Sequence, residues 1–198
     1  MNHIIKSEFA RKGIHLSNAI IPLSYYYFFM PNKIDMIIVL AAILIFSFII
    51  EIYRKNSNKL SVFFSNWLDY MMREKEKKGE ITGATWVFVG ALFTILLVPD
   101  PFNIVSLLFL SFGDTFAAII GMKYPFIKIG RKTLSGSIAG FFACITVGLV
   151  IAFPINFEII IFGAFTAMFI ELLPLPVNDN VSIPIFSGLS MYYFSLIV

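Results

Sequence analysis

The residues best suited to chemistry lie between positions 111 and 140, in the run SFGDTFAAIIGMKYPFIKIGRKTLSGSIAG. Asp114 stands in an apolar stretch, where a charged side chain costs roughly 2.5–3.5 kcal/mol at the centre of a membrane helix. Lysines and an arginine follow within twenty residues, and GRKTLSGS opens the next apolar stretch. Carboxylates near phosphate-binding cations suit a hard ion such as Mg²⁺. The pattern indicates metal-assisted phosphate chemistry at a membrane surface.

The loop after Asp114 carries the predicted phosphate-binding groups. It combines cations, hydroxyls and the free N–H groups of a helix start, which together favour an anion. Alternatively, the loop could be a basic membrane anchor followed by a Ser/Thr helix cap. Its Gly136 could belong to a GxxxG pair that packs helices together. The predicted members are Arg131, Lys132, Ser135, Gly136 and Ser137.

Three carboxylates are predicted as metal ligands, namely Asp114, Glu171 and Asp179. Acids near helix C-termini oppose the helix dipole and need a cation, a metal or a proton nearby. Asp114, Asp179 and Lys132 are the predicted catalytic groups, with Asp179 as a second metal ligand or the base. The alternatives are a structural Asp114 paired with Lys or Arg, and a turn or helix cap for Asp179 in its NDN run.

Four further residues are predicted to contact the phosphates of a nucleotide: Lys12, His15, Thr82 and Asn180. Lys12 could instead be a membrane anchor, and Thr82 could be a helix N-cap. With one cysteine and two histidines in the chain, a zinc site of the Cys/His type is not expected.

The composition excludes an ordinary soluble domain. Hydrophobic residues make up 59% and charged residues 14% of the 198 residues, against about half and a quarter in soluble domains. Seven apolar runs could cross about 30 Å of hydrocarbon. They cover residues 14–30, 34–52, 84–98, 102–120, 134–153, 155–173 and 182–198. The sequence predicts a single all-α polytopic membrane domain over residues 1–198, with about seven transmembrane helices.

The distribution of cations predicts the orientation. With the N-terminus in the cytoplasm, every Lys and Arg except Lys33 faces inward, which is the positive-inside pattern. This favours an N-in, C-out protein of the cell (inner) membrane with its site facing the cytoplasm. Residues 57–80 are predicted to form an interfacial amphipathic helix, anchored by Trp67, and a cytoplasmic loop.

The motifs together resemble the CTP-dependent polyprenol kinases, which include dolichol, phytol and farnesol kinases and the related CTP-using diacylglycerol kinases. The resemblance covers nearly the whole chain. It rests on RKGIH at 11–15, ExxR at 51–54, TGATW at 82–86, SFGDTFAAIIG at 111–121, GRKTLSGSIAG at 130–140, and Glu171 with NDNVSIP at 178–184.

The resemblance implies transfer of the γ-phosphate of CTP to the hydroxyl of a lipid alcohol, with Mg²⁺ as cofactor. Asp114 and Asp179 would then hold Mg²⁺ or orient the hydroxyl, and Lys132 with two serines would bind phosphates. The implied partners are a nucleoside triphosphate, a lipid alcohol and membrane lipids, without nucleic acid; no oligomeric state is predicted. Met122, Pro125 and Ser135 depart from the family pattern and bear on the choice of nucleotide.

Three other readings stay open. A CTP-dependent diacylglycerol kinase differs only in its acceptor. A phosphatidate cytidylyltransferase would transfer CMP and release pyrophosphate, but its longer signature is absent from the sequence. A lipid transporter or flippase would need polar groups across the membrane, and the outer ends of the predicted helices offer few.

Overall fold

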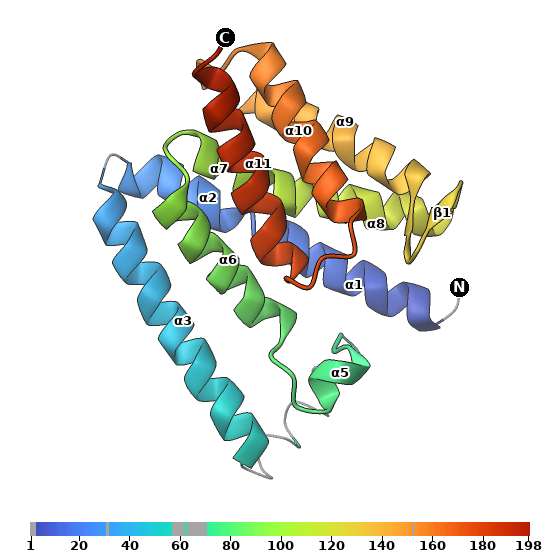
Figure 1. Ribbon diagram of the computed structural model, residues 1–198. Helices are drawn as coiled ribbons and strands as arrows, with labels where there is room; N and C mark the ends of the chain where they lie inside the picture. The colour runs from blue at the N-terminus through green and yellow to red at the C-terminus, as the bar shows by residue number, and fades with distance from the viewer. Residues whose placement is uncertain (1–2, 31, 57–61, 63–70, 152) are drawn as a thin grey trace.

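Helices make up nearly all of the regular structure in the computed structural model, which describes residues 3–30, 32–56, 62, 71–151 and 153–198. The described strands, β1 and β2, form a short antiparallel hairpin (Figure 1). The prediction of a helical protein is confirmed, and this hairpin is the exception to its all-α form. In chain order the elements are α1 (His3–Ser17), α2 (Ile20–Ser24), η1 (Tyr25–Phe29), α3 (Lys33–Asn56), α5 (Glu74–Lys77), α6 (Gly83–Leu97), α7 (Phe102–Leu108), η2 (Phe109–Gly113), α8 (Asp114–Lys123), β1 (Lys128–Ile129), β2 (Lys132–Thr133), α9 (Leu134–Val150), α10 (Phe157–Leu172) and α11 (Asp179–Ser195).

Each of the seven predicted spans falls on helical structure, but seven membrane crossings are not confirmed. In the described part of the chain, two helices are long and apolar enough to cross a membrane: α3 and the continuous helix Phe102–Lys123 formed by α7, η2 and α8. The helices α6 and α9 are apolar but shorter. The predicted span 14–30 is broken between α1 and α2, where Pro22 cannot donate a hydrogen bond to the carbonyl of Asn18.

The main core lies where η2 and α8 pack against α9, α10 and α11. Phe109, Cys144 and Met191 are fully buried in it. Small residues let the helices approach closely: a Cβ added to Gly113 would meet Cys144 Sγ at 2.6 Å and Met168 Cε at 2.8 Å. Close contact of this kind is typical of helices that pack in a membrane.

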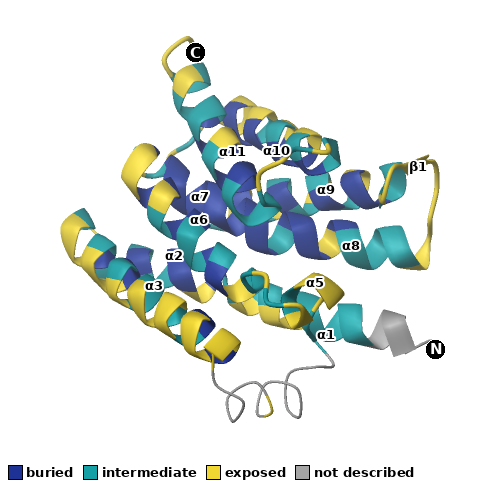
Figure 2. Cartoon of the chain, turned by 60° about the horizontal axis from the view of Figure 1, so that its bottom comes forward, coloured by how far each residue is buried: buried dark blue, intermediate teal, exposed yellow. Residues whose placement is uncertain are grey.

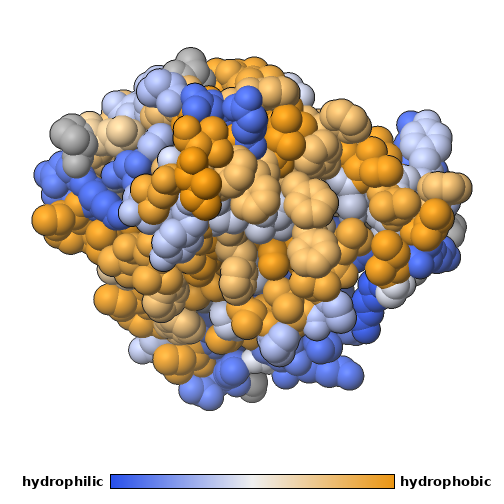
Figure 3. All heavy atoms as spheres, turned by 45° about the horizontal axis from the view of Figure 1, so that its top comes forward, coloured by the Kyte–Doolittle hydropathy of each residue, from blue (hydrophilic) through white to orange (hydrophobic). Residues whose placement is uncertain are grey.

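Much of the surface is apolar. Exposed residues run along most of α3 in Figure 2, and they include Ile45, Phe46 and Ile52. Figure 3 shows hydrophobic residues over the middle of one face, with hydrophilic residues mainly toward its edges. So large an exposed apolar surface marks contact with a membrane or a partner. With the two apolar helices, it supports a membrane protein.

A polar cluster fastens η1 to the start of α7. The buried Tyr25 hydroxyl donates to the carboxylate of Asp100, at 3.0 Å to Oδ1, and Asn103 Nδ2 donates to the same oxygen at 2.6 Å. Because the cluster is remote in the fold from the groups predicted to do chemistry, it serves to hold the helices together.

Most of the predicted interfacial helix, including Trp67, lies outside the described residues. Within 57–80 the structure describes Val62 and residues 71–80, where the short helix α5 forms. The prediction of an interfacial helix therefore stays a prediction.

Candidate active site

Asp114 meets two residues of α1. Its Oδ2 atom forms an ion pair with Lys12 Nζ and lies 3.1 Å from His15 Nε2. The carboxylate is buried, so the neighbouring ammonium group offsets much of the cost of keeping it charged. The structure thus brings together three predicted residues from segments about a hundred positions apart in the chain.

The turn before Asp114 is π-helical rather than α-helical. The segment η2 contains one such turn, and Asp114 is the first residue of the α-helix that follows. A π turn accommodates one extra residue, so the residues after it lie about 100° from where an uninterrupted α-helix of the same sequence would place them. The direction in which Asp114 faces therefore depends on η2.

Lys132 lies between two other predicted acids. Its Nζ is 2.6 Å from Glu171 Oε1 and 3.1 Å from Asp179 Oδ2, and Ser137 Oγ donates to Glu171 Oε2 at 3.3 Å. Burial opposes the charge of the Lys132 ammonium, but the carboxylates of Glu171, Asp114 and Asp179 outweigh burial and raise its pKa above that of an ordinary lysine. Lys132 is therefore a permanent cation at neutral pH.

The two clusters form one charged site. Lys132 lies within electrostatic reach of Asp114 as well as of its own partners, so the Lys12 and Lys132 clusters act on each other. We call this group the lysine–carboxylate site; it comprises Lys12, His15, Asp114, Lys132, Ser137, Glu171 and Asp179. Helices α1, α8, α9, α10 and α11 and the hairpin all contribute to it, although they are spread over most of the sequence.

The three predicted metal ligands do not form one ligand set. Among the described residues, no group of three or more His, Cys, Asp or Glu side chains is placed to hold a metal ion. Asp114 pairs with Lys12, while Glu171 and Asp179 share Lys132. Mg²⁺ commonly binds through one or two carboxylates plus the phosphates of a substrate. The donors fit a magnesium–nucleotide complex but not a cage made by the protein alone.

Three predicted residues of the hairpin and its flank stand apart from the acids. Ser135 Oγ donates to the carbonyl of Tyr124 at 2.7 Å, which closes the loop 124–135. Arg131 is exposed beside Gly130, whose φ of +60° permits the turn. Gly136 packs against the backbone of Ala117, and a Cβ there would overlap the Ala117 carbonyl oxygen. Ser135 and Gly136 thus shape the loop and the packing of α8 on α9.

Thr82 and Asn180 occupy a neighbouring region at the start of α6. The Thr82 hydroxyl donates to Glu51 Oε1 at 2.6 Å, and Asn180 Nδ2 donates to the carbonyl of Gly83 at 3.1 Å. Asn180 follows Asp179 directly, so this contact borders the lysine–carboxylate site. The predicted site did not include Glu51 or Arg54, although Glu51 is one of the acids near a helix end that need a cation, and Arg54 is that cation. The sequence signal for their contact with α6 was the ExxR motif at the end of one apolar run and the Thr-Gly pair before the next.

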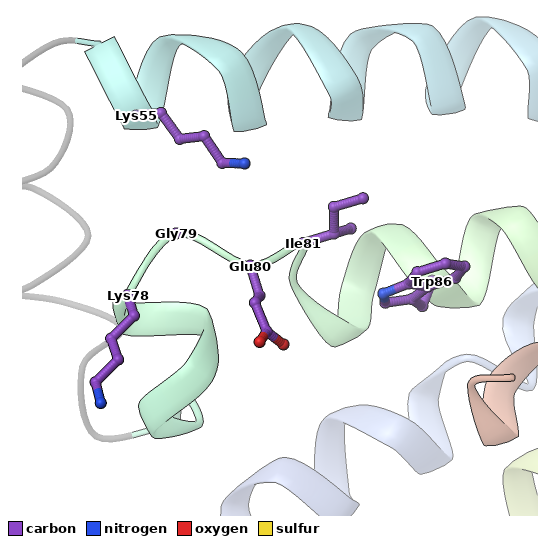
Figure 4. Close-up of a pocket in the computed structure, with 6 residues that line it drawn as sticks. All are labelled: Lys55, Lys78, Gly79, Glu80, Ile81 and Trp86. Atoms are coloured by element: carbon purple, nitrogen blue, oxygen red, sulfur yellow. The ribbon is translucent and has the colours of Figure 1, made fainter. Parts of the chain in front are cut away.

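A pocket of about 410 Å³ lies beside the start of α6 (Figure 4). It is lined by Lys55, Lys78, Gly79, Glu80, Ile81 and Trp86. Figure 4 shows Lys78 directing its ammonium group away from Lys55, so the two cations do not converge on one point. The lining includes none of the residues of the lysine–carboxylate site.

Fold and site define a helical, largely apolar protein whose lysine–carboxylate pairs range from mostly buried to partly exposed. No family model matches the chain, and no solved structure matches it significantly. An uncharacterized protein of Rickettsia prowazekii is 29% identical over 199 residues, which cover 96% of each chain. CTP-dependent diacylglycerol kinase 1 of Saccharomyces cerevisiae is 33% identical over 150 residues, which cover 74% of this chain. The chain spans 50% of the yeast protein's length. This likeness supports the CTP-dependent kinase family that the motifs indicate.

Proposed function

We propose that the protein is a CTP-dependent lipid kinase that transfers the γ-phosphate of CTP to the hydroxyl of a membrane lipid alcohol. The observation that carries the proposal is the lysine–carboxylate site, in which Lys12 and Lys132 face Asp114, Glu171 and Asp179. The similarity to a yeast protein named as a CTP-dependent diacylglycerol kinase supports the choice of nucleotide and of reaction.

The two lysines bind the phosphates of the nucleotide. Phosphoryl transfer depends mainly on positioning and on neutralising charge over the transferred group. Each ammonium group now pairs with carboxylates, and it exchanges a carboxylate for a phosphate oxygen when the nucleotide enters. Ser137 adds a hydroxyl donor beside Glu171.

The acids freed by this exchange have two roles. Three carboxylates face two ammonium groups, so the site is short of positive charge, and a triphosphate adds further negative charge. Asp114, Asp179 and Glu171 are the residues available to hold Mg²⁺, which supplies charge neutralisation for the phosphates. A carboxylate left without the ion accepts the proton of the acceptor hydroxyl; Asp179, whose side chain is 40% exposed, is the most accessible of the three.

The acceptor belongs to the class of lipid alcohols. The site is built on apolar helices, and the apolar outer surface lets a lipid approach from the membrane while the nucleotide enters from water. The family resemblance favours a polyprenol, phytol, farnesol or geranylgeraniol. The name of the yeast relative favours diacylglycerol as the second candidate. The basic residues gathered near the helix ends favour an integral protein of the cell membrane with this site facing the cytoplasm.

The test uses purified protein in lipid bilayers with Mg²⁺ and CTP labelled separately at its α- and γ-phosphates. The acceptor panel contains phytol, geranylgeraniol, longer polyprenols, diacylglycerol and phosphatidate, and an Asp114→Asn variant serves as the control. We expect γ-label in an alcohol for the wild type and a loss of at least a hundredfold for the variant. Transfer of α-label to phosphatidate would instead establish a cytidylyltransferase. If no label moves from CTP but ATP serves as donor, the assignment of the nucleotide is wrong.

A further inference from the structure

A buried ion pair closes the end of α3. Arg54 Nη2 and Nε donate to Glu51 Oε2 at 2.6 and 3.1 Å. The two residues are 7% and 5% exposed, although they lie in the last turns of a helix that is mostly exposed. Burying both charges is costly unless further hydrogen bonds satisfy them. Their partners therefore show what the pair does.

Further hydrogen bonds join this pair to the segment that leads into α6. Glu51 Oε1 accepts from the Thr82 amide at 2.9 Å, from the Thr82 hydroxyl at 2.6 Å and from the Thr85 hydroxyl at 3.1 Å. Arg54 donates to the carbonyls of Glu76 and Glu80 at 2.7 and 2.8 Å. One carboxylate and one guanidinium thus fix residues 76–85, including the first turn of α6.

The start of α6 in turn holds the start of α11. The carbonyl of Gly83, next to Thr82, accepts from Asn180 Nδ2 at 3.1 Å. Two turns further along α6, Gly90 lies so close to α11 that an added Cβ would overlap the carbonyl oxygen of Asn180. The adjacent Asp179 carries the carboxylate that meets Lys132 at 3.1 Å.

We propose that Glu51 and Arg54 are positioning residues for the lysine–carboxylate site: through Thr82, Gly83 and Asn180 they hold Asp179 opposite Lys132. The proposal rests on the proposed function, because it assigns Asp179 to the reacting end of that site. The hydrogen bonds of Glu51 and Arg54 described above lead to residues 76–85, so their effect on the three acids passes through α6. Small displacements of a group at a reacting centre can lower rates by about a hundredfold.

Thr82→Val is the main variant, because it keeps the shape of the side chain and removes one donor to Glu51 without exposing a charge. We expect kcat to fall about tenfold while the KM for CTP changes less than twofold. Thr82→Ser retains the hydroxyl and should restore most of the rate. Glu51→Gln should lower kcat further with the same pattern. A rise in the KM for CTP at unchanged kcat would instead show that Thr82 binds the nucleotide directly, and would overturn the proposal.

A double-mutant cycle tests whether the effect passes through Asn180. If Thr82 and Asn180 act along one chain of contacts, Thr82→Val combined with Asn180→Ala should be no slower than the slower single variant. Independent effects would multiply, which would contradict the proposal. Tyr25→Phe is the matched control, since it loses a buried hydrogen bond in the cluster remote from the site and should leave kcat unchanged.

Hydrogen exchange separates this inference from the proposed function, because it needs no activity. In Thr82→Val we expect the amides of residues 181–183, 185 and 186 at the start of α11 to exchange about tenfold faster, with amides 190–195 unchanged. If the exchange rates changed equally along α11, or did not change, the positioning role would be overturned even in an active enzyme. If the wild type transfers no phosphate, the kinase proposal fails while the exchange result still decides whether Glu51 and Arg54 position α11.

Discussion

Replacing Lys132 with Met should destabilise the fold, because it leaves a buried carboxylate without its cation. The side chain of Glu171 is 4% exposed and lies 2.6 Å from Lys132 Nζ. Breaking a fully buried ion pair costs about 3–5 kcal/mol, whereas an exposed pair contributes about 0.2–1 kcal/mol. The Lys132 side chain is 32% exposed, so water reaches one partner. We therefore expect Lys132→Met to lower the free energy of unfolding by about 2–3 kcal/mol, between these limits.

The assay is equilibrium unfolding in mixed detergent micelles, followed by circular dichroism. Lys128→Met is the matched control: this exposed lysine lies on the other strand of the same hairpin, and its loss should change stability by about 0.5 kcal/mol or less. The double variant Lys132→Met with Glu171→Gln removes the unpaired charge and should recover at least half of the loss. A cost below about 1 kcal/mol for Lys132→Met, or no recovery in the double variant, would refute the electrostatic reasoning.

Three further measurements address packing, the remote cluster and pH. Gly90→Ala should cost about 1–3 kcal/mol in unfolding experiments, because its Cβ would overlap an α11 carbonyl oxygen, whereas Gly13→Ala, with nothing within 4 Å, should be neutral or stabilising. Tyr25→Phe should cost about 0.5–1.5 kcal/mol by removing the hydrogen bond to Asp100. Folding raises the pKa of Lys132. The stability that the charged Lys132 gives the fold is therefore fully present below the pKa of the unfolded chain, about 10.4, and is lost as the pH rises through the pKa of the folded protein. Deprotonation of Lys132 should therefore cause no loss of stability between about pH 6 and 9. Above about pH 10.4, Lys132→Arg should lose less stability than the wild type, because arginine stays charged.

The sequence predicted the helical ranges better than the contacts among the residues selected for the site. Long apolar runs predict helices such as α3 directly. Where no water is available, a helix is one of the few structures in which the backbone groups of one segment satisfy each other's hydrogen bonds. Charged residues in apolar surroundings are equally visible, which is why Asp114, Lys132, Glu171 and Asp179 could be selected. Pairing of Asp114 with a Lys or Arg was one alternative, but which lysine meets which acid was not predictable, since it depends on how distant helices pack.

The local contacts of single residues could not be predicted for a different reason. Ser135 was predicted to bind phosphate but satisfies the backbone of its own loop, and the same hydroxyl could serve either purpose. Thr82 likewise bonds to Glu51, a residue 31 positions away. The π turn of η2 leaves no recognisable pattern in a mostly apolar run in which every residue but Phe112 is buried. Propensity and periodicity describe one segment at a time, whereas these features arise from contacts between segments.

The π turn of η2 also limits how the chain can change in length. Losing one residue between positions 102 and 113 while the π turn is kept would turn Asp114 about 100° away from Lys12, whereas a loss that returns the π turn to a plain α-helix would leave the direction of Asp114 unchanged. The exposed loop 124–131 carries no such constraint, because its length does not set the direction of Asp114. Related chains that share this site should therefore have either this spacing before the acid with the π turn, or a spacing one residue shorter with a continuous α-helix, while the spacing between the acid and the following lysine can vary.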